Sequence, residues 1–293
     1  MKRSRNVLQR LALTVVMTVI AIILLFPIVI TFTNSIMTQL EMEINYGLIG
    51  VMKEVQPGEE NPFVNLKLLP DKVSWEQYEK VLIDSPFFLK LFWNSVFLMV
   101  PIIVGQTIVA AFAAYAFSKL RFYGRETLFV LYVLTMLMPF QVTLVPNYIM
   151  VDRLGMLNNA SAIILPGIFA AFGVFMLRQF MQQIPYAYIE AAKIDGAGHF
   201  RIFWTIIFPM VKPGVAALVV LLFVDYWNMV EQPLIFLEDP FEQPLSVYLS
   251  EINKGERGVA FAASMLYMTP MVLLFMYAES NFIEGIQLSG IKG

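Results

Sequence analysis

RQFMQQIPYAYIEAAKIDGAGHFRIFWTIIFPMVKPG, residues 178–214, is the stretch that decides the fold of this chain. It lies between two long apolar runs but carries seven acidic or basic side chains, which are Arg178, Glu190, Lys193, Asp195, His199, Arg201 and Lys212. A charge at the centre of a membrane helix costs roughly 2.5–3.5 kcal/mol even on the lenient insertion scales. The stretch therefore indicates a polar loop on one side of a membrane.

Two short helices are expected within this loop. The first covers residues 186–194 and places Ala187, Ala191 and Ile194 on one face. The second, Phe200–Phe208, is expected to end at the proline that follows it. Two short helices at a bend, attached to a membrane bundle, form a docking surface for another protein.

The composition places the rest of the chain in a membrane. Of its 293 residues, 58% are hydrophobic and 14% are charged, whereas soluble domains contain about 25% charged residues. The apolar residues occur in blocks of the length that spans a bilayer, about 20 residues, which predicts an all-α protein with six transmembrane helices. The blocks are Leu11–Leu40, Leu91–Ser118, Thr127–Val151, Leu154–Leu177, Gly258–Ala278, and Pro213–Val230, which contains Asp225.

The distribution of basic residues predicts the orientation. The N-terminal segment holds Lys2, Arg3, Arg5 and Arg10 without an acidic residue, and the first apolar run is longer than that of a signal peptide. Lysine and arginine are denser in this segment and in residues 178–214 than in the longer loops assigned to the other side. The positive-inside rule then predicts that both termini and residues 178–214 are cytoplasmic.

The spacing within the polar loop resembles the EAA signature of ABC-importer permeases. That signature is E-A-A-x-x-x-G, nine residues, then I-x-L-P, and Phe208 stands here where leucine is usual. Further matches resemble the carbohydrate-uptake branch over most of the chain, and the whole is similar to the second-type permease of a maltose-like system. The matching residues are Glu190-Ala191-Ala192, Gly196, Ile206-x-Phe208-Pro209, Asn94-Ser95, Ala113–Ala116 before Arg121, Asn158 before Ile164-Leu165-Pro166, Ile194–Ala197 and Trp227-Asn228.

The resemblance assigns roles within the loop. It implies that residues 178–214 are a cytoplasmic coupling loop, that Glu190 is the polar contact with an ATPase subunit, and that Ala191 and Ala192 allow close approach. Asp195 and Gly196 form the turn that follows. The residue types agree with this role, because small side chains beside an acid suit insertion into a groove.

The resemblance also implies a set of partners. These are a homologous permease that completes a heterodimer, two ATP-binding subunits and an extracytoplasmic solute-binding protein, all at the plasma (inner) membrane of a bacterium. The chain itself is expected to bind no cofactor, because the partner subunits use the ATP. Membrane lipid is expected around the single domain formed by residues 1–293, and no feature suggests nucleic acid.

Residues 34–90 are expected to form a long extracytoplasmic loop between the first two helices. Ser74 is predicted to cap a short amphipathic helix with Trp75, Tyr78 and Leu82 on one face. Residues 41–65 are either a surface decoration or an extra contact for a solute-binding protein.

The apolar block that begins at Pro213 is the fifth along the chain, and it is expected to be a helix that reaches roughly Pro233. It carries the polar residues of a candidate substrate pathway. Asp225 lies roughly 20 Å along the helix from its cytoplasmic end, where an ionisable side chain faces protein or water. Asp225 and Asn228 could bind a sugar, with Tyr226 or Trp227 stacked on its ring. The alternative is a hydrogen bond between helices, and the sequence leaves both open. Prolines within the second, third and fourth blocks predict kinks around a central pathway.

The sequence lacks the residues that several kinds of catalytic and metal-binding site require. The sequence has no cysteine, one histidine and no lysine followed by serine or threonine, which excludes a P-loop, zinc thiolates and histidine metal clusters. The function expected is therefore that of a non-enzymatic permease subunit of a binding-protein-dependent sugar importer. The alternatives are a permease of the same fold for another solute, such as a phosphate ester or polyamine, and a membrane-embedded enzyme. The spanning runs carry no lysine or arginine for a phosphate.

Overall fold

The computed structural model describes residues 2–46, 66–251 and 257–290, and this part of the chain is all-α, as predicted. Contacts divide the chain into two compact units. The first unit comprises Met1–Leu89 and Glu251–Thr269, and the second comprises Lys90–Ser250 and Pro270–Gly293. Helices α4 (Pro86–Lys119) and α15 (Arg257–Gly290) contribute residues to both units. The organisation of residues 1–293 as a single domain stays a prediction.

Four to six segments of the described chain have the length and composition of membrane spans. Four helices or near-continuous helix pairs qualify directly, and two further pairs qualify if each strongly bent pair is one span. The four are Arg10–Ser35 of α1 (Lys2–Ser35), Pro86–Lys119 of α4, Ser161–Gln182 across α7 (Ser161–Ile168) and α8 (Ala171–Gln183), and Arg257–Glu279 of α15. The predicted membrane helices are thus found, while the count of six and the orientation stay predictions.

The third predicted span is not one helix. It divides into α5 (Arg125–Met136) and α6 (Phe140–Arg153), which are bent by 100° relative to each other. The reason lies at Pro139, whose backbone is extended with φ −63° and ψ 143° and which has no N–H for a helical hydrogen bond. The chain therefore leaves one helix and begins another, where the sequence predicted a kinked but continuous helix.

The fifth predicted span is shorter than expected. Helix α12 (Lys212–Trp227) ends six residues before Pro233, which lies instead inside the separate short helix α13 (Glu231–Phe236). Sixteen residues span roughly 24 Å. The residues at the end of α12 therefore lie at a helix terminus rather than inside a membrane helix.

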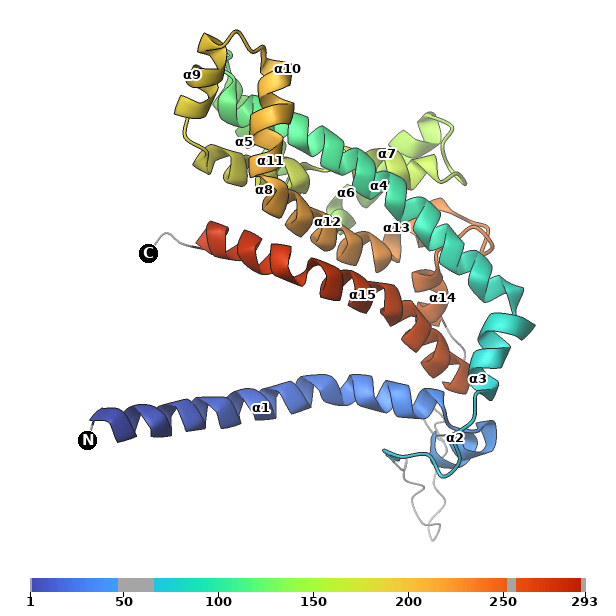
Figure 1. Cartoon of the computed structure of the whole chain (residues 1–293). Coiled ribbons are helices and arrows are strands. Elements are labelled where there is room, and N and C mark those ends of the chain that lie inside the picture. Colours follow the sequence, from blue (N-terminus) through green and yellow to red (C-terminus); the bar gives the residue numbers. More distant parts are fainter. Residues whose placement is uncertain (1, 47–65, 252–256, 291–293) are drawn as a thin grey trace. The chain divides into compact units, whose positions relative to one another are not determined.

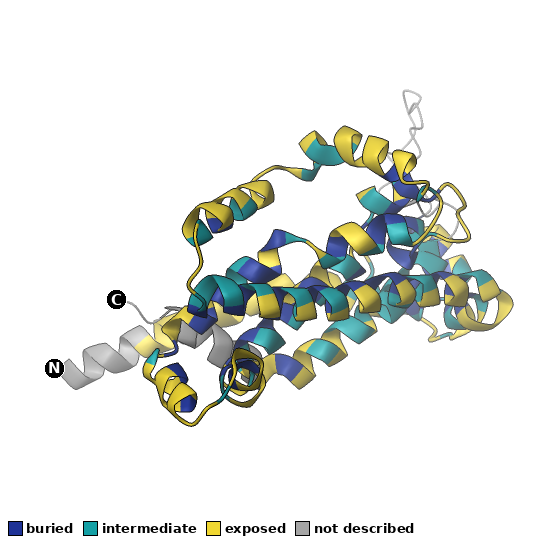
Figure 2. Ribbon diagram, turned by 90° about the horizontal axis from the view of Figure 1, so that it is seen from above, coloured by how far each residue is buried: buried dark blue, intermediate teal, exposed yellow. Residues whose placement is uncertain are grey.

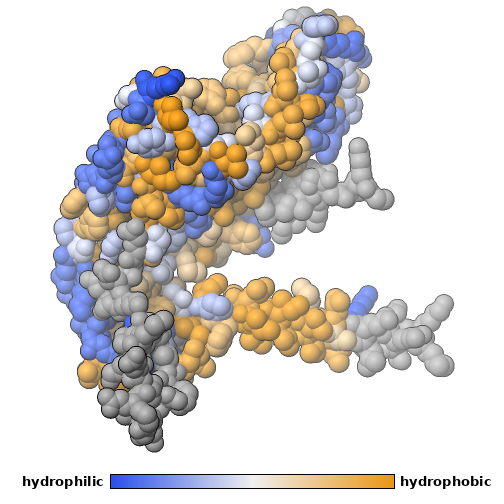
Figure 3. Space-filling view, turned by 180° about the vertical axis from the view of Figure 1, so that it is seen from behind, coloured by the Kyte–Doolittle hydropathy of each residue, from blue (hydrophilic) through white to orange (hydrophobic). Residues whose placement is uncertain are grey.

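In the first unit, α1 presents an apolar surface that no other described part of the unit covers. Residues 10–29 are all exposed (yellow in Figure 2), and their side chains form a hydrophobic rod (orange in Figure 3). Such a surface is suited to lipid or to another membrane helix. At the end of α1, the side chain of Asn34 accepts a hydrogen bond from the hydroxyl of Tyr46 in α2 (Gln39–Tyr46) at 3.2 Å.

The amphipathic helix predicted within residues 34–90 is present as a short helical segment. It consists of α3 (Glu76–Glu79) and a π-helical turn, Lys80–Asp84. Gln77 and Val81 are buried, whereas Trp75 is 65% exposed. Ser74 does accept a hydrogen bond from the N–H of Glu76, at 3.2 Å. The rings of Trp75 and Tyr78 lie side by side with centroids 5.5 Å apart, in agreement with their predicted common face. Residues 47–65 of the proposed extra contact lie outside the described residues.

In the second unit, α4 packs against α7, α8 and the end of α12. Glycines permit the close approach, since a Cβ on Gly173 would lie 2.9 Å from that of Ala110 and one on Gly167 would lie 2.8 Å from Ile102. Leu98 and Ile102 of α4 share a buried cluster with residues of α7 and α13. Helices α9 (Ala187–Ile194) and α10 (His199–Ile202) lie at one end of α4, and α7 and α13 lie toward the other (Figure 1).

Candidate functional site: a coupling hairpin and an uncharged cavity

The predicted coupling helix is present as α9. It follows Pro185 and ends at a turn in which Gly196 adopts a left-handed conformation with φ +75°. The N–H of Gly196 donates to the carbonyl of Lys193 at 3.0 Å, and that of Ala197 donates to Ala192 at 2.9 Å. Glycine is the residue that takes this conformation without steric cost, so Gly196 makes the sharp turn that its position predicted.

The two faces of α9 differ. Ile189 is 0% exposed and Ala192 is 7% exposed, so this face packs against the chain. Glu190 and Ala191 are exposed on the other face, and Ile194 is 86% exposed. Asp195 is also exposed in the turn. Of the predicted alanine pair, Ala191 is therefore exposed, whereas Ala192 is buried. The burial of Ala192 could have been predicted from its spacing of three residues from Ile189.

Helix α9 and the helical segment after the turn, residues 187–210, are here called the hairpin, and its second helix continues through Pro209. It consists of α10, a π-helical turn at Phe203–Ile207 and α11 (Phe208–Met210), and it ends at Met210. The expected end before Pro209 was wrong. The proline stands in the first turn of α11, where its missing N–H is tolerated. The chain then bends by 74° into α12.

Three contacts attach the hairpin to the end of α4. The buried Lys119 ammonium donates a 2.6 Å hydrogen bond to the carbonyl of Ile184, directly before the hairpin. The hydroxyl of Tyr115 and Nδ1 of His199 are 3.0 Å apart, within hydrogen-bond distance. The ring of Phe112 stacks on that of Phe203 with centroids 4.7 Å apart. His199 is thus exposed to solvent and also contacts α4.

Arg178 joins the loop to a neighbouring helix. Its side chain is 7% exposed, lies 3.8 Å over the ring of Phe129 in α5 and donates to the carbonyl of Phe117 at 3.2 Å. It also forms a 2.9 Å ion pair with the carboxylate of Glu126. The start of the polar stretch, residues 178–214, is therefore fixed to both α4 and α5.

Of the four predicted pathway residues, Asp225, Tyr226 and Asn228 line one hollow, whereas Trp227 does not. Trp227 is 1% exposed and its ring packs between those of Phe92 and Phe223, with centroids 5.6 and 5.4 Å away. In this conformation it cannot stack on a sugar, which corrects the prediction for this residue. Asp225 is exposed, and the exposed Asn228 donates to the carbonyl of Val224 at 2.7 Å.

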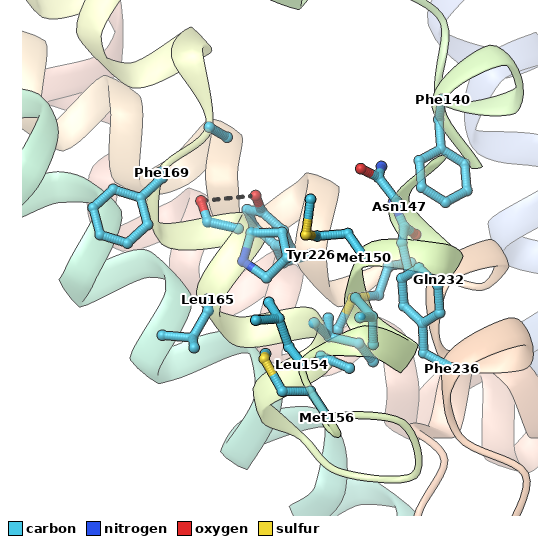
Figure 4. A pocket seen from close by; sticks show the side chains of 17 residues that line it. Phe140, Asn147, Met150, Leu154, Met156, Leu165, Phe169, Tyr226, Gln232 and Phe236 are labelled. Carbon is cyan, nitrogen blue, oxygen red and sulfur yellow. Dashed lines mark hydrogen bonds between the residues drawn. The ribbon is translucent and has the colours of Figure 1, made fainter. Parts of the chain in front are cut away.

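Tyr226 lines a cavity of about 470 Å³ enclosed by α6, α7, α12 and α13 (Figure 4). Its hydroxyl donates to the carbonyl of Gly167 at 3.4 Å. The amides of Asn147 and Gln232 are the other polar side chains of the lining. The remaining lining is largely aromatic and apolar, and none of the described residues that form it is charged. It includes Phe140, Met150, Leu154, Met156, Leu165, Phe169 and Phe236.

Amides, a phenol and aromatic rings around an uncharged cavity suit a neutral, hydroxyl-rich ligand. The amides can donate and accept hydrogen bonds, and the rings can cover an apolar face of a sugar. Sequence reasoning missed Asn147 and Gln232. Each is an amide beside a proline of an apolar stretch, Pro146 and Pro233, and that signal could have identified them.

Acidic side chains lie beside this cavity. A second, more open hollow of about 500 Å³ is lined by Asp225, Tyr226, Asn228 and Glu231, among others. The Glu231 carboxylate accepts two hydrogen bonds from the Gln141 amide at 3.1 Å. Two carboxyl side chains, those of Asp225 and Glu231, therefore lie beside Tyr226 in this hollow.

The sequence and structure are similar to those of known transport proteins. Residues 2–282 match the family model described as the binding-protein-dependent transport system inner membrane component. The arabinooligosaccharides transport system permease protein AraQ of Halalkalibacterium halodurans is 26% identical over 100% of both chains. The lactose permease LacG of Rhizobium radiobacter is 30% identical over 72% of this chain and 77% of its own length. The sn-glycerol-3-phosphate permease UgpE of Yersinia enterocolitica is 32% identical over 69% and 74%.

A solved structure has the same fold. It is the crystal structure of a bacterial ABC transporter involved in the import of the acidic polysaccharide alginate, and its chain superposes with a TM-score of 0.78 at 23% identity. The match covers 94% of this chain and 97% of that one.

Proposed function

Because this chain belongs to the inner membrane components of binding-protein-dependent transport systems, we propose that it is a permease subunit of a bacterial importer for a neutral oligosaccharide. It forms half of the translocation pathway, and a homologous permease forms the other half. A solute-binding protein delivers the sugar from outside, and two ATP-binding subunits drive the cycle. The chain crosses the plasma membrane six times with both termini in the cytoplasm.

The uncharged cavity carries the assignment of substrate class. Asn147, Tyr226 and Gln232 supply hydrogen bonds without a charge, and the aromatic lining supplies stacking surfaces. The acidic groups at Asp225 and Glu231 in the adjacent hollow disfavour a phosphate ester. The names of two similar permeases, for arabinooligosaccharides and lactose, support the same class.

The exposed face of α9 is the observation that supports coupling of this chain to an ATP-binding subunit. Glu190, Ala191 and Ile194 project from a hairpin that is fixed at its base to α4. A small and an acidic residue beside a protruding apolar side chain fit a groove in an ATP-binding subunit. In this cycle, closure of the two ATP-binding subunits moves α9 and opens the pathway outward, and ATP hydrolysis resets it.

The substrate is tested by reconstituting the complete complex with its solute-binding protein and measuring ATP hydrolysis with a panel of solutes. Arabinotriose and lactose represent neutral sugars, a trigalacturonate represents acidic ones, and sn-glycerol 3-phosphate represents phosphate esters. Stimulation by a neutral sugar is expected. Stimulation by the phosphate ester alone would favour the second candidate, a glycerol-phosphate importer, to which the 32% identity with UgpE points. A chain that binds no ATPase subunit would overturn the importer assignment.

Two substitutions in the cavity test its role in transport. Asn147→Leu and Gln232→Leu each remove a hydrogen bond to a neutral ligand, typically 0.5–1.5 kcal/mol, so the KM for uptake should rise roughly three- to tenfold. Gln141→Leu is the matched control, because Gln141 lies on α6 like Asn147 but does not line the cavity. Equal effects of all three substitutions would contradict the assignment.

A further inference from the structure

Helix α4 contacts the coupling hairpin at one end and a loop between α13 and α14 (Leu245–Glu251) at the other. From Lys90 onward, α4 and these partners all belong to the second unit. The distance between the two sets of contacts, from Ser95 to Tyr115, is roughly 30 Å along a continuous helix. One element therefore touches segments on opposite sides of the predicted membrane.

At the outer end, polar side chains of α4 bind the backbone of residues 237–246, here called the outer loop. The amide of Asn94 donates to the carbonyls of Phe241 at 2.8 Å and Gln243 at 3.0 Å. The hydroxyl of Ser95, which is 2% exposed, accepts from the N–H of Leu245 at 2.9 Å. Since backbone groups are bound, the outer loop must follow α4 when it moves, whatever its side chains contact.

At the inner end, α4 binds the coupling hairpin through the three contacts described above. Lys119 holds the carbonyl of Ile184 before α9, and Tyr115 holds His199 at the start of α10. Phe112 stacks on Phe203 in the π-helical turn that follows. Both arms of the hairpin are attached, so a displacement of α9 pulls or pushes on α4.

Between these ends, α4 forms part of the wall behind the uncharged cavity. Ile102 is 0% exposed and lies so close to Gly167 that a Cβ there would come within 2.8 Å of it. Gly105 is similarly close to Ile168, because a Cβ on this glycine would lie 2.7 Å from the isoleucine side chain. Displacement of α4 would therefore also change the cavity.

We propose that α4 is the transmission element of this permease: it links the ATPase-facing hairpin directly to the outer loop, through Lys119 and Tyr115 at one end and Asn94 and Ser95 at the other. The inference rests on the proposed docking of α9 to an ATP-binding subunit. Coupling between distant sites requires an element that both sites bias, and α4 is bonded to both. By reciprocity, an event at the outer loop, such as docking of the solute-binding protein, also changes the position of α9.

The test uses a reporter in the outer loop of the complete complex. Because the chain has no natural cysteine, Glu242→Cys, at an exposed position, gives a single attachment point for a spin label once the cysteines of the partner chains have been replaced. The mobility and solvent accessibility of the label are compared in the nucleotide-free state and after trapping with ATP and vanadate. ATP hydrolysis and the copurified ATP-binding subunits are measured in the same preparations.

The expected result is a clear change of the label signal in the wild-type background on trapping. Asn94→Ala and Lys119→Met, each combined with Glu242→Cys, should reduce that change at least threefold while the ATP-binding subunits remain bound. Lys119→Arg, which keeps a donor, should restore most of it. Gln141→Leu, which removes a hydrogen bond outside α4, should leave the change intact.

The outcomes separate the two proposals. If the wild-type chain binds no ATP-binding subunit, the proposed function fails. If it binds and hydrolyses ATP but the label does not respond, or if both α4 variants respond as the wild type does, the transmission role of α4 is overturned. An equal loss in Gln141→Leu would also overturn it, because the response would then not depend on α4. If Lys119→Met detaches the ATPase, Asn94→Ala decides, since its contacts lie at the far end of the helix.

Discussion

Gly196 combines a required backbone conformation with open space around it. Its φ is +75°, and a Cβ added there would meet no atom within 4 Å. The cost of a side chain is therefore one of backbone conformation, of order 1–3 kcal/mol, rather than of collision. A residue that cannot adopt this conformation should reorient the end of α9 without disturbing the membrane helices.

Gly196→Val should consequently uncouple the transporter. We expect uptake to fall at least about tenfold, since a reorientation of 1.4 kcal/mol already corresponds to a factor of ten, while insertion into the membrane and some ATP hydrolysis persist. Gly198→Val is the matched control, because Gly198 has φ −73° and ψ 163°, which valine adopts readily. Uptake and hydrolysis are measured in the same vesicles. Normal uptake by the Gly196 variant would contradict the role of this turn.

At the residue scale, the sequence predicted local backbone conformation well. It predicted poorly which side chains are buried. The glycine turn and the exposure of Glu190 follow from a motif whose determinants lie within a few residues. The burial of Trp227 depends on Phe92, which lies 135 positions away on another helix. No local pattern encodes that contact, so a tryptophan assigned to a pathway proved to be part of the core.

Arg178 illustrates how one side chain unites elements. Its guanidinium joins α8 to α5 through Phe129 and Glu126 and to α4 through the carbonyl of Phe117. Arg178→Met should destabilise the complex by about 1–3 kcal/mol, because the carbonyl loses its donor and the ring loses its cation. The side chain of Glu126 is 60% exposed, so the ion pair with Glu126 contributes little to this loss of stability.

The measurement is the thermal unfolding midpoint of the complex in detergent, which should fall by a few degrees. Arg178→Lys should recover part of this, since lysine keeps the charge but not the planar group. Arg121→Met is the control, because Arg121 is exposed and lies 5.6 Å over the ring of Tyr186. An equal shift in the control would show that the effect does not depend on the buried contacts.

The contact between α4 and α8 depends on a small residue. A Cβ on Gly173 would lie 2.9 Å from that of Ala110 and 3.3 Å from Leu218. Gly173→Val should force α8 away from both neighbours and destabilise the protein by about 1–3 kcal/mol. Chymotrypsin resistance of the complex should fall accordingly. Gly198→Val again serves as a control, and unchanged resistance of the Gly173 variant would show that the helices can separate at little cost.

At the element scale, hydropathy located the apolar blocks but not their bends. A block of uniform apolar residues is equally compatible with a straight, kinked or broken helix. Pro139 produced a 100° bend, while Pro101 and Pro166 lie inside helices that continue past them. Which outcome occurs depends on whether neighbouring elements satisfy the freed carbonyls, and that information is tertiary.

At the scale of the whole molecule, the predicted topology is open to a direct test. If residues 178–214 are cytoplasmic and the outer loop is extracytoplasmic, Glu242→Cys should react with a membrane-impermeant maleimide on intact cells. Lys193→Cys should react only after the membrane is opened. Both positions are exposed in the structure and the chain has no other cysteine. The reverse pattern of labelling would contradict the predicted orientation.

The burial of Trp227 also gives the molecule an optical property. The chain has four tryptophans, and while Trp75, Trp93 and Trp204 are 65%, 55% and 45% exposed, Trp227 is 1% exposed between rings from α4 and α12. Its emission should therefore report on the packing of the protein interior, because its ring is covered by aromatic side chains of the chain itself. Replacing the three exposed tryptophans by phenylalanine would leave a single intrinsic fluorophore whose spectrum follows the separation of these two helices in real time.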